Sequence, residues 1–263
     1  MPADGNMSLA DHLRELRYRV VVSIVVIAIG AIIAGFFYES HLYGFLLQPW
    51  KSAREALLAS RPGQELEVAN FGVTAPMTLA IKICAVVGMV ASAPVWIYQL
   101  WAFIAPGLLA KEKKWALAFV GSATPLFILG VAVGYTVLPK GIEVMLQFTP
   151  EEQQVTNMLD LTTFLNFMLR LMLVFGLGFL MPVAVVALNL MGVLPWEQLR
   201  KVRIYVVFGT FVFGAVATPS TDPFSMLMLA LPMTVLYLIA EVICWLNHRR
   251  QRKRADTEAE VVA

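Results

Sequence analysis

The stretch LMLVFGLGFLMPVAVVALNLMGVLPW, residues Leu171–Trp196, contains no charged side chain. It exceeds the roughly 18 apolar residues that mark a helix able to cross a bilayer. Five other uncharged runs reach at least that length: Val20–Phe37, Ile83–Ala110, Trp115–Pro139, Ile204–Thr221 and Pro223–Ala240. With 59% hydrophobic and 14% charged residues, the chain carries too much apolar surface for a soluble domain. The sequence therefore predicts an all-α integral membrane protein with six transmembrane helices.

The positions of the basic residues predict how these runs are oriented across the membrane. Fourteen of the twenty Lys and Arg residues form four clusters, which lie in every second gap between the runs. The clusters are Arg14, Arg17 and Arg19; Lys111, Lys113 and Lys114; Arg200, Lys201 and Arg203; and Arg249, Arg250, Arg252, Lys253 and Arg254. Cytoplasmic loops of membrane proteins carry an excess of Lys and Arg. We therefore expect both termini in the cytoplasm, which requires an even number of spans.

One membrane domain accounts for residues 1–255, and a polar tail over residues 256–263 is expected to be disordered. The expected spans are residues 18–38, 76–104, 115–139, 161–191, 204–218 and 223–246. Four prolines inside them favour kinks: Pro94, Pro125, Pro182 and Pro232. Kinked helices of unequal length favour a curved, concave wall over a regular bundle.

The segment between the first two spans, residues 38–75, is predicted to form an ordered external cap. Its apolar stretch His41–Trp50 contains aromatic residues suited to a membrane interface. We expect Pro49 to end this stretch and Lys51–Ala59 to form a separate amphipathic helix.

Catalysis has little support in the sequence. The three histidines share no metal-ligand spacing, and no HExxH, GxSxG, Walker A or CxxC motif is present. Basic clusters that alternate with membrane spans are poorly explained by nucleic-acid binding. We expect no enzyme activity, no catalytic residue, no metal and no cofactor.

Charged residues near or inside spans are functional candidates by default. Lys82 and Glu241 lie close to span ends, which favours snorkelling to the interface, whereas Arg170 lies about 13 Å into its span. On the inner face, Glu15 and Glu112 each stand among basic residues. They either balance local charge or form a docking site for a cationic ligand, because a carboxylate accepts a bidentate guanidinium pair.

Several segments resemble the TatC family, the large subunit of the twin-arginine protein translocase. They are His12–Arg19 (HLRELRYR), Ser92–Leu108 (SAPVWIYQLWAFIAPGL), Glu112 in its basic setting, Pro182–Ala184, Leu199–Arg203, and Ala217–Pro219 followed by Asp222. They occur in family order across nearly the whole chain, and the family topology is also six spans with cytoplasmic termini. The resemblance implies a multi-pass protein of the bacterial cytoplasmic (inner) membrane, a receptor and core subunit for proton-motive-force-driven export of folded proteins.

The resemblance also implies a binding site for twin-arginine signal peptides on the cytoplasmic face. Its residues would be Glu15, Leu16, Arg17, Phe103 and Glu112. Glu15 and Glu112 would accept the arginine pair, Phe103, Leu13 and Leu16 would offer apolar contact, and Arg17 would orient Glu15 or steer the peptide.

Further implied partners are single-span TatA- and TatB-like proteins, the lipid bilayer and other copies of the chain within a larger complex. Partner contacts are implied along span five and the following turn, at Thr218, Pro219 and Asp222. Gln99 either adds polarity to the concave wall or is an inner-face residue bonded to local backbone. Some members carry an acidic or amide residue in mid-span four, where this chain has Leu180.

Two alternative functions belong to other classes of membrane protein. A small-molecule secondary transporter would use Arg170 and Lys82, but the halves show no inverted repeat and the spans lack central acids. A membrane scaffold without a transport role is the second alternative.

Overall fold

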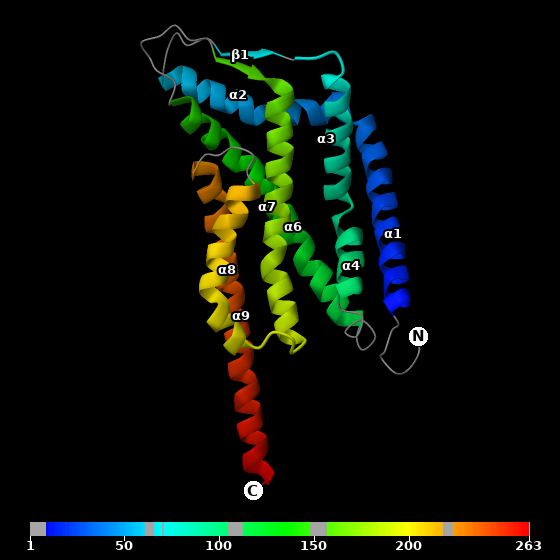
Figure 1. Cartoon of the computed structure of the whole chain (residues 1–263), viewed down its shortest axis with the longest axis vertical. Coiled ribbons are helices and arrows are strands. Elements are labelled where there is room, and N and C mark those ends of the chain that lie inside the picture. The colour runs from blue at the N-terminus through cyan, green and yellow to red at the C-terminus, as the bar shows by residue number, and fades with distance from the viewer. Residues whose placement is uncertain are drawn as a thin grey trace. The chain divides into compact units, whose positions relative to one another are not determined.

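A computed structural model describes residues 9–60, 66–69, 71–104, 113–147, 157–217 and 223–262. Its first compact unit is Met1–Gly176 and its second is Leu177–Ala263. The first unit holds α1 (Leu9–Phe36), a π-helical turn (Tyr38–Leu42), α2 (Tyr43–Ser60), β1 (Leu66–Ala69), α3 (Ala75–Ala91), α4 (Ala93–Ile104), α6 (Lys113–Gln147) and β2 (Asn157–Asp160). Helix α7 (Leu161–Leu190) leads into the second unit, which holds α8 (Trp196–Ala217) and α9 (Pro223–Val262) (Figure 1).

The predicted all-helical, multi-pass membrane class is confirmed. Four helices among the described residues are long and apolar enough to cross a membrane: Ala10–Phe36, Leu117–Gly141, Leu161–Leu190 and Met226–Arg250. The bent pair α3–α4 makes a fifth if it forms one span. Helix α8 corresponds to predicted span five, but its first turns carry Glu197, Arg200, Lys201 and Arg203. The count of six spans and the cytoplasmic termini stay predictions.

The bend between α3 and α4 follows from Pro94. The two helices meet at 67° on either side of Ser92. Pro94 has no N–H to continue the hydrogen-bond ladder, so the carbonyls of the last turn of α3 need other donors. The indole N–H of Trp96 donates to the carbonyl oxygen of Met89 at 2.9 Å. The kink expected at Pro94 is thus present, while Pro125, Pro182 and Pro232 lie inside α6, α7 and α9.

The expected break at Pro49 is wrong. Helix α2 runs through Pro49 without interruption, and the predicted Lys51–Ala59 helix is its second half. A proline inside a helix leaves the carbonyl four residues earlier without a donor. Here the Tyr135 hydroxyl donates to that carbonyl, of Phe45, at 2.8 Å, and the Tyr135 and Phe45 rings stack with centroids 4.6 Å apart. Helix α6 thereby satisfies the group that Pro49 exposes.

Two glycines bring α1 and α3 into backbone contact. A Cβ atom on Gly88 would lie 2.4 Å from the Ala31 nitrogen and 2.7 Å from the Ile27 oxygen. A Cβ atom on Gly30 would lie 3.0 Å from the Gly88 Cα. Small residues at a crossing let membrane helices approach closely. This contact holds α1 along the α3–α4 pair.

Two short strands complete the cap of the first unit. Strands β1 and β2 pair in parallel, with Leu66 opposite Asn157 and Ala69 opposite Asp160. The sequence did not predict them. Asp160 then caps α7 by accepting from the Thr162 and Thr163 backbone N–H groups, each at 3.2 Å. A hydrogen bond from the Thr163 hydroxyl is the largest cause that lowers the Asp160 pKa, and the backbone N–H bonds lower it further against the opposing effect of desolvation.

In the second unit, α8 and α9 are joined by polar contacts along their length. The Thr210 and Thr234 hydroxyls lie 2.9 Å apart, and the Tyr237 hydroxyl donates to the Leu199 carbonyl at 3.2 Å. Buried Leu199, Tyr237 and Cys244 form the core of this unit. Helix α9 continues to Val262, past the point where we expected a disordered tail to begin. The Ala and Glu residues there are good helix formers, and the division into domain and tail stays a prediction.

Candidate functional site

Glu15 and Phe103, two of the predicted signal-peptide residues, lie where α1 begins and α4 ends, since the two helices pack side by side (Figure 1). His12 on α1 stacks on Phe103 on α4, with ring centroids 4.5 Å apart and an interplanar angle of 20°. One turn after His12, Glu15 lies on the same stretch of α1. The geometry thus brings an apolar ring from α4 close to a carboxylate on α1.

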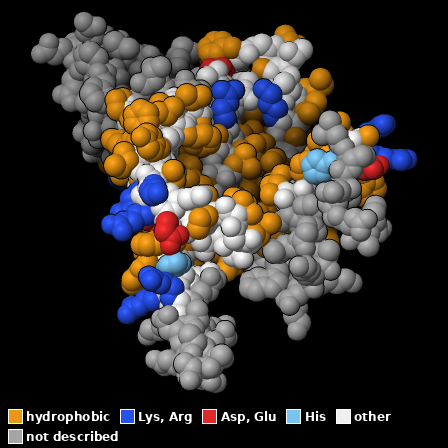
Figure 2. All heavy atoms as spheres, turned by 60° about the horizontal axis from the view of Figure 1, so that its bottom comes forward, with side chains coloured by type: hydrophobic (Ala, Val, Ile, Leu, Met, Phe, Trp, Pro, Cys, Tyr) orange, Lys and Arg blue, Asp and Glu red, His pale blue; other side chains and the backbone are white. Residues whose placement is uncertain are grey.

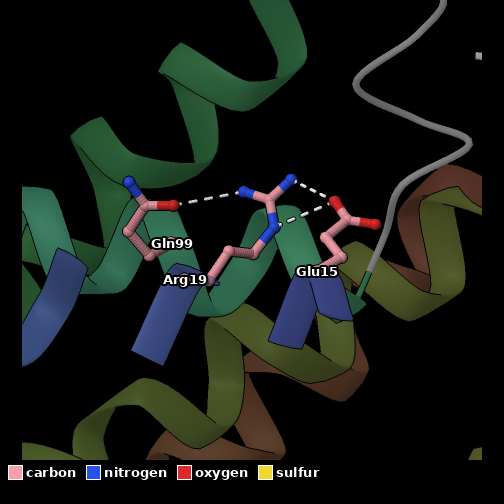
Figure 3. A network of polar contacts seen from close by, with 3 residues as sticks. All are labelled: Glu15, Arg19 and Gln99. Carbon is pink, nitrogen blue, oxygen red and sulfur yellow. Dashed lines mark hydrogen bonds and ion pairs between the residues drawn. The ribbon is translucent and has the colours of Figure 1, made fainter. Parts of the chain in front are cut away.

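Glu15 already binds a guanidinium. Arg19 donates to the Glu15 Oε1 atom from Nε at 3.0 Å and from Nη2 at 2.5 Å. Its third nitrogen, Nη1, donates to the Gln99 Oε1 atom on α4 at 3.2 Å. Figure 3 shows the guanidinium lying between the two acceptors, with the Glu15 Oε2 atom pointing away from it.

The spacing along α1 explains the first half of this network. Residues four apart on a helix are neighbours, and a Glu placed before its basic partner is the favourable order. Only 18% of the Arg19 side chain and 16% of the Glu15 side chain are exposed. Partial burial weakens the screening of their attraction by water. The pair is therefore stronger than an ordinary surface salt bridge.

The other predicted binding residues differ in what the structure shows of them. Leu16 is half-buried, whereas Arg17 and Leu13 are exposed. The contact that orients Glu15 comes from Arg19. The role implied for Arg17, to orient Glu15 or to steer the peptide, stays a prediction. Four predicted residues lie outside the described part of the chain: Glu112, Thr218, Pro219 and Asp222.

Two residues of this site, His12 and Arg19, were not predicted to belong to it. Both lie in the quoted stretch His12–Arg19, and Arg19 also belongs to the first basic cluster. The four-residue spacing between Glu15 and Arg19 was a usable signal. The stacking of His12 on Phe103 and the bond from Arg19 to Gln99 join residues far apart in the chain, which no local pattern reveals.

The three charges placed within spans have different environments. Lys82 is exposed and donates to the Asn166 Oδ1 atom at 3.0 Å, and Arg170 is exposed on α7. Glu241 does not snorkel: it is 3% exposed and accepts from Arg203 at 2.8 Å and 2.5 Å. Glu241 is thus a structural link between α8 and α9.

Candidate metal ligands do not cluster among the described residues. Within the ranges that the structure covers, no three His, Cys, Asp or Glu side chains gather as metal ligands. Cys84 and Cys244 are free thiols. Figure 2 shows hydrophobic side chains over much of the coloured surface, with Lys and Arg side chains in a few separate groups. Such a surface fits a lipid environment.

Comparison with known proteins agrees with this picture. The family model described as "Sec-independent protein translocase protein (TatC)" matches residues 11–232. The protein of that name from Frankia casuarinae is 38% identical over 257 residues, covering 97% of this chain and 70% of the relative. The one from Aquifex aeolicus is 33% identical over 253 residues, covering 96% and 99%. The one from Escherichia coli strain K12 is 34% identical over 243 residues, covering 91% and 88%.

Solved structures show the same relationship. The crystal structure of the twin-arginine translocase receptor TatC in the detergent DDM superposes with a TM-score of 0.74 at 33% identity, covering 88% of this chain and 98% of that one. A second crystal structure of the receptor gives 0.72, covering 89% and 98%. The resemblance found in the sequence is confirmed over nearly the whole chain. The chain belongs to the TatC family: it is a multi-pass subunit of the Sec-independent, twin-arginine protein translocase in the bacterial cytoplasmic membrane, a transport protein and not an enzyme.

Proposed function

We propose that this chain is the receptor that binds twin-arginine signal peptides at the cytoplasmic ends of α1 and α4. One observation carries the proposal: the Glu15 carboxylate is set to hold a guanidinium, because it already accepts two N–H groups from Arg19. Carboxylates bind guanidinium groups with a two-point geometry that an ammonium does not reproduce. A site of this kind distinguishes arginine from lysine in a leader peptide.

The neighbouring groups suit the rest of such a peptide. Phe103 and the exposed Leu13 offer apolar contact beside the carboxylate. Glu112 is proposed as the second carboxylate, by its place in the family motif. Gln99, for which the sequence left a concave-wall and an inner-face position open, links α4 to the Glu15–Arg19 pair.

Peptide binding to the purified full-length protein tests the proposal. A fluorescent signal peptide with Arg-Arg should bind more tightly than the same peptide with Lys-Lys. Glu15→Gln should weaken binding of the Arg-Arg peptide at least tenfold, because a charge-assisted hydrogen bond is worth roughly 1.5–3 kcal/mol. Glu39→Gln is the matched control, since Glu39 is an exposed carboxylate in the turn after α1. Equal binding of both peptides, or unchanged binding by the Glu15→Gln variant, would contradict the proposal.

We also propose that α8 receives the single-span TatA- or TatB-like partners. Four large apolar residues of α8 recur at four-residue intervals and are all exposed: Ile204, Phe208, Val212 and Val216. They form one stripe on the helix. Disulfide cross-linking from Phe208→Cys to a cysteine in the partner should exceed that from Val206→Cys, because Val206 packs against the core of the second unit. Equal cross-linking from both positions would contradict a stripe-specific contact.

Homo-oligomerisation within a larger complex and energy from the proton-motive force complete the proposed function. Membership of the TatC family supports these two parts of the proposal. Export of a folded reporter carrying a twin-arginine leader should stop when a protonophore collapses the proton gradient, and continued export would refute this part.

A further inference from the structure

We propose that Arg19 is an internal arginine ligand of Glu15, which a signal-peptide arginine must displace in order to bind. The inference rests on the proposed function, because it concerns the affinity of the same carboxylate. It adds an autoinhibitory contact: in the unliganded protein, the site is closed by a side chain of its own helix.

The geometry shows why Arg19 competes with a peptide and does not merely stand near it. Nε and Nη2 are the two donors of the side-on face of a guanidinium, and both end on Glu15 Oε1. A peptide arginine needs both Glu15 oxygens for its two-point contact, and Arg19 already occupies Oε1 with the same chemical group. The positive charge of Arg19 also cancels the carboxylate charge that would attract the peptide.

Gln99 holds the competitor in place from a different helix. Its amide oxygen accepts from Arg19 Nη1 at 3.2 Å, so the guanidinium is fixed at three nitrogens. Because α1 and α4 pack against each other, this second anchor is available before any ligand arrives. Pre-organisation of this kind lowers the entropy that Arg19 loses on pairing with Glu15.

Closure of the site by Arg19 lowers the apparent affinity for a peptide. A ligand that binds only the open site has an apparent dissociation constant equal to its intrinsic value divided by the open fraction. The factor is the same for every ligand of Glu15. Arg19 therefore leaves the ratio between arginine and lysine leaders unchanged and lowers both affinities, so that the weaker lysine leaders no longer occupy the site at ordinary concentrations.

Two substitutions of Arg19 separate competition from other roles. Arg19→Gln removes the competitor and should tighten binding of the Arg-Arg peptide by roughly five- to tenfold, as expected if Arg19 closes most sites at rest. Arg19→Lys keeps the charge but loses the two-point contact, and it should tighten binding by an intermediate factor. The Lys-Lys peptide should gain by the same factors as the Arg-Arg peptide.

Arg14→Gln is the matched control for charge. Arg14 is exposed on the same helix, and its removal changes the net charge equally. A gain for Arg19→Gln no larger than that for Arg14→Gln, or an Arg19→Lys variant that binds like the unsubstituted protein, means that only the general charge matters, and overturns the inference. Weaker binding by both Arg19 variants means that Arg19 supports Glu15, and also overturns it.

Failure of the inference is distinguishable from failure of the proposed function. If the unsubstituted protein prefers the Arg-Arg peptide and Glu15→Gln weakens binding, the receptor function stands whatever the Arg19 variants do. If Arg19→Gln does not yield folded protein, Arg19→Lys decides the question alone: tighter binding supports the competitor, and unchanged or weaker binding overturns it.

Discussion

At the residue scale, what a polar side chain does in this molecule depends on its partner. Glu15, Glu241 and Lys82 are bonded to Arg19, Arg203 and Asn166, respectively. Glu241 is buried and linked to a neighbouring helix, whereas Glu15 is only partly buried and leaves one oxygen pointing away from its guanidinium. The difference in burial, and not the shared carboxylate chemistry, separates the structural role of Glu241 from the binding role proposed for Glu15.

Tyr135 gives a prediction at this scale. Tyr135→Phe keeps the stacked ring but leaves the Phe45 carbonyl, already deprived of a donor by Pro49, without a hydrogen bond. We expect a loss of about 1 kcal/mol in the free energy of unfolding, seen as a thermal midpoint lower by about 2–4 °C in detergent. Tyr205→Phe is the control, because Tyr205 is exposed on α8 and its hydroxyl should matter little. Equal midpoints for both variants would refute the compensation of Pro49 by Tyr135.

At the element scale, close contacts between helices position the site. Gly30 and Gly88 bring α1 against α3, and the bend at Ser92 then carries α4 toward the start of α1. The sequence predicted these helices and the bend at Pro94, because uncharged runs and prolines are local signals. It did not predict the continuous α2 or the pair β1–β2, because a donor from α6 and a strand partner far along the chain stabilise them. It left two roles open for Arg17 and did not predict the contact from Arg19 to Glu15.

Gly88→Ala tests the helix contact. The added methyl group would meet the α1 backbone at 2.4 Å, so the helices must separate. We expect a destabilisation of about 1–3 kcal/mol, the usual cost of overpacking, together with weaker peptide binding as α1 shifts from α4. Gly121→Ala on α6 is the control, since nothing lies within 4 Å of its Cβ position. If the two variants are equally stable, the crossing is looser than the geometry indicates.

Asp160, which caps the N-terminus of α7, makes the stability of the fold depend on pH. Hydrogen bonds from Thr163 and Thr162 hold the Asp160 pKa below its ordinary value of 3.8. The ionised carboxylate therefore stabilises the fold above about pH 4, and this contribution is lost as the pH falls through the lower folded-state pKa. The thermal midpoint of the unsubstituted protein should exceed that of Asp160→Asn at pH 7, and the difference should shrink below pH 4. A difference that stays constant down to pH 3 would show that the charge on Asp160 is irrelevant.

At the scale of the whole molecule, the Lys and Arg clusters predict that α8 crosses the membrane, which the length and hydropathy of the helices alone do not. Within the part of the chain that the structure describes, four helices and one bent pair meet the length and hydropathy expected of spans, while α8 begins with a charged turn. If α8 crosses the membrane over the fifteen residues between Arg203 and Pro219, its apolar length is about 22 Å. This is shorter than the roughly 30 Å hydrocarbon core, so the bilayer beside it should thin.

Labelling from outside the cell decides whether α8 is a span. In a protein whose two native cysteines are replaced by alanine, single cysteines at Gln198, Ser220 and Glu258 are offered to a membrane-impermeant maleimide in intact spheroplasts. Because the basic clusters predict that residues near 200 and 250 lie in the cytoplasm, only the cysteine at position 220 should react, and the other two should react after the membrane is permeabilised. Protection of position 220 would place both ends of α8 on one side of the membrane and remove α8 from the spans. Labelling at position 258 in intact spheroplasts would place the C-terminal cluster outside, and either result would contradict the six-span topology on which the cytoplasmic receptor depends.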